Sequence, residues 1–329
     1  MLEHGGNLRA AQQRYGRDGH DGWIDLSTGI NPWGYPAPPV PADAWHRLPE
    51  PDPALAAAAC AYYGAPLLLP VAGTQAAIQA LPRLRPPSRV TVSAPSYAEH
   101  AQHWGRHGHS LRQAPYEQLD AAVEHSDVVV LCNPNNPTGA VVPAQQLRDW
   151  AARLGRRGGW LVVDEAFGDT APGLSVAGDC AQPGLVVLRS VGKFFGLAGL
   201  RLGFVGAHPR LLVELADLLG PWAVSGPAQA IALAALRDQA WQEATQARLR
   251  TAGERMRALL HGHGIDANGT PLFHWWPQAR PEALHEHLAS RGIWCRLFSQ
   301  AARGIRLGLP ANEDEWQRLA RALEEWSER

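Results

Sequence analysis

Short apolar runs alternate with helix-like stretches between about residues 65 and 207 of the chain. Continuous runs such as Val128, Val129, Val130 and Leu131 are typical of strands that are buried on both faces, as in parallel sheets. Strands that alternate with helices predict a mainly parallel, doubly wound sheet with helices on its faces. The predicted strands cover residues 67–70, 89–93, 127–132, 160–164, 184–189 and 203–206, and the predicted helices cover residues 76–84, 97–107 and 143–156.

The pattern changes near residue 228. The first 45 residues are irregular and rich in Gly and Pro, so we expect them to lie over the sheet domain or to join the C-terminal part. We predict a large domain, residues 46–227, and a smaller α/β domain, residues 1–45 and 228–329. Within the smaller domain we expect a long helical stretch over residues 228–260, then strand 272–276, helix 281–290, strand 304–309 and helix 313–326.

Composition and charge narrow the range of partners. Of the 329 residues, 46% are hydrophobic, and 30 Lys and Arg face 31 Asp and Glu, so no excess positive charge attracts nucleic acid or an anionic membrane. Four scattered cysteines, none in a C-x-x-C pair, argue against a disulfide framework and favour a cytoplasmic setting. The N-terminus does not resemble a signal peptide, and no apolar stretch reaches the ~18 residues that a membrane span requires.

Several common motifs are incomplete. His103 and His107 have the spacing of a zinc-binding pair on a helix, but no H-E-x-x-H motif or carboxylate set accompanies them. Gly192-Lys193 resembles the end of a P-loop, yet Val187 and Phe194 occupy the places of its first Gly and its Ser or Thr. There is no G-x-G-x-x-G turn after an early strand and no G-x-S-x-G elbow. We therefore expect no metal, and we expect the paired histidines to lie on solvated helix faces: His103, His107, His109, His261, His263, His285 and His287.

Polar residues follow four of the predicted strands, at the edge of the sheet where ligands bind. Gly73-Thr74 can hold an anion, although plain N-capping by Thr74 is the favoured reading of that pair alone. Residues 133–139 form a rigid turn, which is either a simple loop or a support for a functional Asn. Asp164 at a strand tip needs a cation, several donors or solvent. Lys193, in an apolar run, is either a desolvated nucleophile or a snorkelling surface lysine.

These pieces together suit pyridoxal phosphate, which needs a Lys, an acidic partner for its ring nitrogen and an anion site for its phosphate. The segments N-P-N-N-P-T-G, residues 133–139, and S-V-G-K-F-F-G-L-A-G-L-R, residues 190–201, resemble the fold-type-I aminotransferase superfamily. The resemblance extends over nearly the whole chain. It implies an α/β fold with a mainly parallel, seven-stranded central sheet between helices and a smaller α/β C-terminal domain.

The resemblance also implies a role for each matching residue. Lys193 would bind the cofactor covalently and later move protons, while Asp164 would pair with the ring nitrogen. Tyr97 would stack on the ring and Asn136 would hydrogen-bond its phenolic oxygen. Arg306 would hold the substrate carboxylate, for which a bidentate guanidinium is suited. The residues implied to hold the cofactor phosphate are Gly73, Thr74, Gln75, Ser190 and Arg201.

Three positions depart from the family pattern. Phe167 replaces a Tyr that reaches the phenolic oxygen, which leaves more of that task to Asn136. Gly192 replaces a Ser that contacts the phosphate. Leu48 replaces a Tyr that reaches the cofactor phosphate of the neighbouring subunit, although a homodimer is still expected.

The N-terminal segment favours one branch of the superfamily. His4-Gly5-Gly6-Asn7 and the later I-N-P-W-G, residues 30–34, resemble the threonine-phosphate decarboxylases of cobalamin biosynthesis. A Gly-Gly turn can receive a phosphate, although a flexible tail is the reading without the resemblance. The expected reaction is decarboxylation of L-threonine O-3-phosphate to (R)-1-amino-2-propanol O-2-phosphate. The alternatives are an aminotransferase for a substrate such as histidinol phosphate and a non-catalytic ligand-binding protein. The expected substrate ligands are His4, Gly6, Asn7, Asn31, Arg296 and Arg306.

Overall fold

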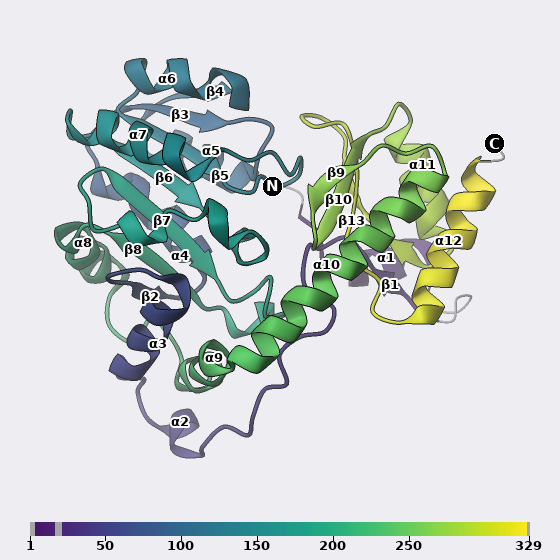
Figure 1. The fold of residues 1–329 in the computed structure, drawn as a ribbon, viewed down its shortest axis with the longest axis horizontal. Coiled ribbons are helices and arrows are strands. Elements are labelled where there is room, and N and C mark those ends of the chain that lie inside the picture. Colours follow the sequence, from purple (N-terminus) through teal and green to yellow (C-terminus); the bar gives the residue numbers. More distant parts are fainter. Residues whose placement is uncertain (1–3, 17–21, 328–329) are drawn as a thin grey trace. The chain divides into compact units, whose positions relative to one another are not determined.

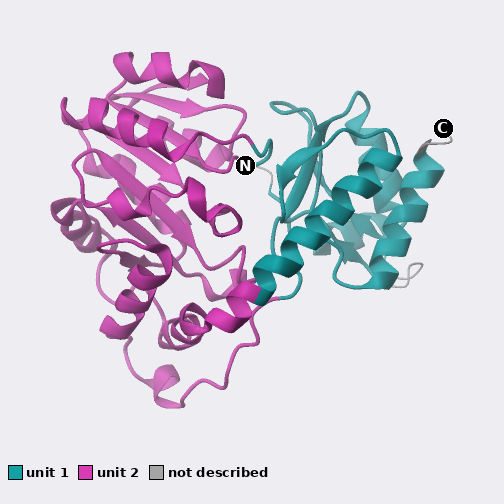
Figure 2. Cartoon of the chain, in the orientation of Figure 1, with its two compact units in different colours: residues 1–33, 136–139, 244–329 teal, residues 34–135, 140–243 magenta. Residues whose placement is uncertain are grey.

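The computed structural model describes residues 4–16 and 22–327, and its chain forms two compact units (Figures 1 and 2). Unit 1 comprises residues 1–33, 136–139 and 244–329, and unit 2 comprises residues 34–135 and 140–243. Residues 34–45 and 228–243 thus pack in unit 2. The domain boundaries drawn from the sequence remain a prediction, because a compact unit is a grouping by contacts.

Unit 2 contains a seven-stranded sheet in the order β2-β8-β7-β6-β5-β3-β4. Strands β3 to β7 run parallel to one another, and β8 is antiparallel to both β7 and β2. The predicted mainly parallel sheet is confirmed. The strands are β2 (Leu69–Val71), β3 (Arg89–Ser93), β4 (Ser110–Ala114), β5 (Val128–Cys132), β6 (Trp160–Asp164), β7 (Leu185–Ser190) and β8 (Gly203–Ala207).

The sheet has an apolar core on its faces. Every residue of β5 and β7 is buried, as expected for central strands of a parallel sheet. One face packs against α4 and α8, through side chains such as Val130, Val162, Leu188 and Ile78. The helices of unit 2 are α2 (Asp43–His46), α3 (Pro53–Tyr63), α4 (Thr74–Ala80), α5 (Ala98–Arg106), α6 (Leu119–His125), α7 (Ala144–Gly155), α8 (Pro209–Leu219) and α9 (Gly226–Arg237).

Unit 1 contains an antiparallel sheet in the order β12-β13-β10-β9. The N-terminal segment belongs to this unit, because β1 (Ile24–Asp25) pairs in parallel with β11 (Ile293–Trp294). Residues 4–16 and 22–33 thus group with the C-terminal part of the chain, which is one of the two alternatives that the sequence left open. The other elements are α1 (Leu8–Tyr15), most of α10 (Gln239–Gly262), β9 (Asn268–Thr270), β10 (Phe273–Pro277), α11 (Pro281–Ala289), β12 (Arg296–Phe298), β13 (Gly304–Leu307) and α12 (Glu313–Ser327).

The long helical stretch predicted over residues 228–260 consists of two helices, α9 and α10. Asp238 lies between them with a non-helical backbone, φ −86° and ψ 76°. Its Oδ1 accepts a hydrogen bond from the Trp241 N–H at 3.0 Å. An Asp in this role starts a new helix rather than continuing the old one. Within the described residues, no helix combines the length and the apolar character needed to cross a membrane.

The expectation of solvated histidines is wrong for four of them. Burial of a polar ring requires a partner, and each ring has one. The contacts are His103 Nε2 with Glu99 Oε2, His109 Nε2 with Pro82 O, His285 Nδ1 with Cys295 Sγ, and His287 Nε2 with Ala322 O. His107 and His261 are exposed, as expected.

His274 on β10 predicts a pH-dependent stability. Its side chain is fully buried, and neither ring nitrogen has a hydrogen-bond partner among the described residues. Burial, with Arg257 adding to it, lowers the pKa of His274 to about 4. The neutral ring therefore contributes stability that is fully present above the unfolded pKa near 6.5 and is lost as the pH falls towards 4.

We expect His274→Leu to remove this part of the pH dependence. Between pH 7 and pH 5 the unfolding free energy of the wild type should fall by about 2 kcal/mol more than that of the variant. Urea unfolding at both pH values measures the difference, with the exposed His261→Leu as control. Equal pH dependence of wild type and His274→Leu would contradict the assignment.

Candidate active site

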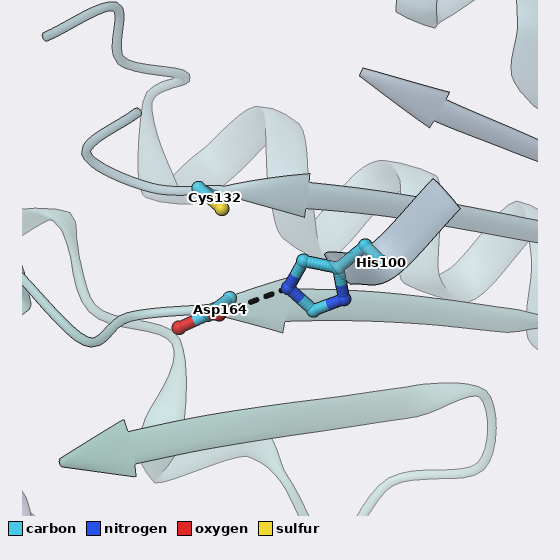
Figure 3. A group of neighbouring side chains, drawn as sticks. All are labelled: His100, Cys132 and Asp164. Atoms are coloured by element: carbon cyan, nitrogen blue, oxygen red, sulfur yellow. Dashed lines mark hydrogen bonds and ion pairs between the residues drawn. The ribbon is translucent and has the colours of Figure 1, made fainter. Parts of the chain in front are cut away.

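A buried carboxylate lies at the carboxyl end of β6. Asp164 is 4% exposed, and its Oδ1 accepts a hydrogen bond from the Ala166 N–H at 3.0 Å. Its Oδ2 lies 2.9 Å from Nε2 of His100, a buried residue of α5 (Figure 3). Asp164 is thus neither solvated nor unpaired, and the reading as a solvated strand end is wrong.

His100 gives this carboxylate a charged partner. Burial by itself lowers the pKa of His100, but the hydrogen bonds with Asp164 and Cys132 outweigh it and raise the pKa to about 10. His100 is therefore an imidazolium at neutral pH. The sequence analysis missed His100. The available signal was its position three residues after Tyr97, which places both side chains on one side of a helix turn.

The same group offers three atoms of the kinds that bind metals. Ligand atoms of His100, Cys132 and Asp164 lie within 4.8 Å of one another (Figure 3). The 2.9 Å separation of the His100 nitrogen and the Asp164 oxygen is that of a charge-assisted hydrogen bond. We therefore interpret the group as a hydrogen-bonded support for Asp164.

A cradle for an anion lies between β2 and β8. Gly73 has φ +73°, and a Cβ placed there would lie 2.8 Å from Nη2 of Arg201. Arg201 itself has φ +54°, an uncommon conformation for a residue with a side chain, and its Nη1 donates to the Ala198 carbonyl at 3.1 Å. The bare backbone of Gly73 therefore leaves the room in which this guanidinium lies.

Two hydroxyl-bearing residues adjoin the cradle. Ser190 ends β7 and pairs directly with Gly203 of β8. A Cβ on Gly203 would lie 2.8 Å from the backbone nitrogen of Thr74, so that this chain segment passes close to the start of α4. Gly73, not Thr74, is the N-cap of α4, and it provides no side-chain cap. The reading of Thr74 as a plain N-cap is therefore wrong.

Tyr97 and Gln75 are tied to each other. The Tyr97 hydroxyl donates to Gln75 Oε1 at 3.3 Å, and Gln75 Nε2 donates to Glu99 Oε2 at 2.8 Å. Burial raises the pKa of Tyr97, so the phenol stays neutral. One N–H of the Gln75 amide is used in these bonds, so its second N–H and the backbone N–H are the donors that Gln75 could offer an anion.

Lys193 lies in the loop after β7 and is half-buried. Its Nζ lies 5.4 Å from the ring centroid of Phe167, the residue that stands where the family pattern has Tyr. The next two residues, Phe194 and Phe195, are buried and pack on Trp241 at centroid distances of 5.7 and 5.6 Å. These aromatic contacts anchor the loop that carries the amine.

Unit 1 contains a buried guanidinium, that of Arg306 on β13. Its Nη1 donates to Asn136 Oδ1 and its Nη2 donates to the Ser27 carbonyl at 2.7 Å. Its Nε is buried with no hydrogen-bond partner among the described residues. Burial, and then the positive charge of Arg296, lower the pKa of Arg306 to about 9 despite Asp25. The hydrogen bonds of this buried cation thus go to neutral oxygens, which suits a site that takes an anion.

The N-terminal segment contacts Ser27, the residue whose carbonyl accepts from Arg306. The Gly6 N–H donates to Ser27 Oγ at 2.7 Å, and a Cβ on Gly5 would lie 2.3 Å from the Ser27 carbonyl oxygen. Gly5 and Gly6 therefore contact Ser27, whereas the His4 and Asn7 side chains are exposed. Arg296 pairs across the sheet with Arg306, so both guanidinium-bearing side chains start from one face.

The structure divides the predicted residues between its two units. In unit 2, the named contacts connect Gly73, Thr74, Ser190 and Arg201 into one group, and Tyr97 with Gln75 into another. Asn31 is buried in unit 1, where its Oδ1 accepts from the Trp33 N–H. Their roles toward ligands remain predictions. The residues in unit 1 are His4, Gly6, Asn7, Asn31, Asn136, Arg296 and Arg306, and those in unit 2 are Gly73, Thr74, Gln75, Tyr97, Asp164, Ser190, Lys193 and Arg201.

Known proteins resemble the chain in sequence and in fold. Residues 42–323 match the family described as aminotransferase class I and II. The chain is 52% identical over 324 residues to threonine-phosphate decarboxylase of Pseudomonas aeruginosa, covering 98% of this chain and 97% of that protein. It is 45% identical over 329 residues to the protein of that name from a Sinorhizobium species, covering 98% and 97%.

Solved structures share the fold. The histidinol-phosphate aminotransferase of Sinorhizobium meliloti, in complex with pyridoxal-5'-phosphate, superposes with a TM-score of 0.83 at 24% identity, covering 97% of this chain and 94% of that one. The L-threonine-O-3-phosphate decarboxylase of Porphyromonas gingivalis gives 0.77 at 21%, covering 93% and 100%. The predicted fold is confirmed.

Gly73→Ala tests the anion cradle. The added methyl group meets Arg201 Nη2 and the positive φ is strained for Ala, so we expect pyridoxal phosphate to dissociate at least about tenfold more readily. Equilibrium dialysis against the cofactor measures this. Gly64→Ala is the matched control, since Gly64 has φ +63° but nothing within 4 Å of an added Cβ. Equal affinities of the two variants would argue against the cradle.

Proposed function

The chain belongs to the aminotransferase class I and II family, and we propose that it decarboxylates L-threonine O-3-phosphate with pyridoxal phosphate as cofactor. The products are CO2 and (R)-1-amino-2-propanol O-2-phosphate, a precursor for cobalamin, with a proton taking the place of the carboxylate. The observation that carries the proposal is the buried, incompletely paired Arg306, which binds Ser27, the residue that Gly6 of the N-terminal segment also binds. The full-length similarity to two threonine-phosphate decarboxylases supports it.

The residues of unit 2 fit the cofactor. Arg201, the Ser190 hydroxyl and the Thr74 backbone supply donors for a phosphate, in a cradle that a Cβ on Gly73 would fill. The Asp164 carboxyl group, whose Oδ2 contacts His100, is the acidic group of unit 2 that would pair with the ring nitrogen. Tyr97 offers an aromatic face with a neutral phenol.

When bound, pyridoxal phosphate supplies an electron sink for the pair left on Cα as the carboxylate departs. The residues of the chain set up this step. Asp164 keeps the ring nitrogen protonated, which maintains that sink. The Lys193 amine holds the cofactor and then delivers a proton to Cα in place of CO2.

The choice of bond depends on how the substrate is held. The bond that breaks must stand perpendicular to the ring of the cofactor, because only then do its electrons overlap the π-system. Threonine phosphate has two anionic ends, and we assign the carboxylate to Arg306. We assign the phosphate to the segment that begins at His4, with Arg296 and Asn31 as auxiliaries. If both the carboxylate and the phosphate of the substrate are held, the bonds at Cα can adopt only one orientation.

We also propose that the protein is a cytoplasmic homodimer, as is typical of this fold. Unit 2 has a groove of about 560 Å³ lined by residues 38–52 and the start of α9. Trp45 and Leu48, two large apolar side chains near it, are 66% and 63% exposed. A second copy of the chain would cover them. Sedimentation equilibrium checks the dimer.

The reaction assignment is tested with the cofactor-loaded protein and threonine phosphate, with and without an oxo-acid acceptor. We expect CO2 release that does not need the acceptor and is lost in Lys193→Ala, which should fold as the wild type does. Release of CO2 and transfer of the amino group are measured separately. Amino transfer to the acceptor without CO2 release would make the protein an aminotransferase instead.

Gly5→Ala tests the role of the N-terminal segment. The methyl group would overlap the Ser27 carbonyl and displace residues 4–7. Loss of one charge-assisted contact costs roughly 1.5–3 kcal/mol, so we expect CO2 release to slow by about one to two decades. Cofactor absorbance should be unchanged. Gly262→Ala is the control, because Gly262, like Gly5, lies outside the positive-φ region, and nothing lies within 4 Å of a Cβ placed there. An unchanged rate in Gly5→Ala would remove the segment from the site.

A further inference from the structure

A buried ion cluster lies behind the cofactor-holding residues of unit 2. Arg189, Glu165 and Asp169 are each at most 6% exposed. Arg189 Nη1 donates to Glu165 Oε2 at 2.6 Å, and its Nη2 donates to Asp169 Oδ1 at 3.1 Å. Exchanging a buried ion pair for apolar side chains is often neutral or stabilising, so stability alone is a weak reason for such a cluster.

The cluster lies next to the site along the chain but on the other face of the sheet. Asp164 is the register partner of Leu188, so both side chains lie on one face, together with Ser190 two residues on. Glu165 and Arg189 immediately follow Asp164 and Leu188, and successive side chains alternate faces. The ion pair therefore ties the ends of β6 and β7 from behind.

Glu165 is held firmly. Its Oε1 accepts from the Val176 N–H at 2.8 Å, and its Oε2 accepts from Ser175 Oγ at 2.6 Å in addition to Arg189. Its backbone N–H donates to the Leu188 carbonyl at 2.9 Å. Arg189 is likewise enclosed, because a Cβ on Gly168 would lie 2.6 Å from its Nη1.

Aromatic contacts continue from the cluster to the loop of Lys193. The guanidinium of Arg189 lies over the Tyr63 ring, 4.3 Å from its centroid. Tyr63 contacts Tyr62 at 4.7 Å between centroids, and Tyr62 contacts Phe195 at 5.3 Å. Phe195 is two residues after Lys193. The Arg189 guanidinium thus connects the end of β6, where Asp164 lies, with Phe195 in the loop that carries Lys193.

The geometry points to Arg189 as a positioning residue: its ion pairs with Glu165 and Asp169 fix the placement of Asp164 relative to Lys193. This inference rests on the proposed function, in which Asp164 and Lys193 act on opposite parts of the pyridoxal phosphate ring. Small displacements between such groups are costly, since catalysis requires their geometry within fractions of an ångström.

Three variants test it in the cofactor-loaded protein. Glu165→Gln keeps the shape and removes the charge, Arg189→Gln breaks both ion pairs, and Arg189→Lys keeps the positive charge. The first readout is the pH titration of the visible absorbance of bound pyridoxal phosphate, which requires no turnover. The others are kcat and KM for threonine phosphate and the midpoint of thermal unfolding. Arg148→Gln is the control, because it breaks an exposed ion pair, Arg148 with Asp179 at 2.7 Å, in the same unit.

We expect Glu165→Gln and Arg189→Gln to move the apparent pKa of the absorbance by on the order of one unit. Their kcat should fall about tenfold or more while KM changes little. Arg189→Lys should recover part of both effects, and Arg148→Gln should show neither.

A lower unfolding midpoint with unchanged absorbance titration and kcat would reduce the cluster to a structural role and overturn the inference. So would failure of all three variants to yield folded protein that binds the cofactor. A wild type that binds no pyridoxal phosphate would refute the proposed function. If it binds the cofactor without releasing CO2, the decarboxylase assignment fails while the absorbance titration still decides the role of Arg189.

Discussion

The burial of the Asp164 carboxyl group at the end of β6 is the constraint on which unit 2 depends. A carboxylate that is 4% exposed pays a large desolvation cost, and it persists as an anion only beside a cation and hydrogen-bond donors. His100 supplies the cation, and the Ala166 N–H supplies a donor. Because His100 lies on the first turns of α5, the helix that starts after Tyr97, the same helix places an aromatic ring and the imidazolium together. The parallel sheet brings the carboxylate to them.

Unit 1 faces the opposite electrostatic problem. Arg306 is buried among carbonyl and amide oxygens, which solvate its charge without neutralising it. The lowered pKa, about 9, expresses this cost, although the group is still charged at neutral pH. An anionic ligand would offset the desolvation cost of the Arg306 charge, and this would contribute to the binding energy of the ligand.

The sequence predicted best what depends on apolar burial. The bounds of β6 match the prediction at both ends, and those of β5 differ by one residue. Continuous apolar runs are buried in such a fold only as the central strands of the parallel sheet. The edge strand β4 was missed, since its residues Ser110–Ala114 are mostly exposed and carry no such run. His100 and the buried histidines were missed or misplaced for another reason. Hydrogen-bond partners such as Pro82 and Ala322 are remote in sequence from these histidines, so no local sequence pattern predicts the burial of the histidines.

The turn of residues 133–139 shows how three similar side chains acquire different tasks. Asn133 binds both backbone groups of Val142, and Asn135 binds Ser96 and the Pro95 carbonyl, so these two amides make the turn rigid. Asn136 differs because its partner is Arg306, and a guanidinium can donate but not accept. The amide oxygen must therefore face the arginine, which directs the NH2 group elsewhere. A hydrogen bond to the phenolic oxygen of the cofactor requires that donor, so the cation that would hold the substrate carboxylate also orients the amide that would hold the cofactor.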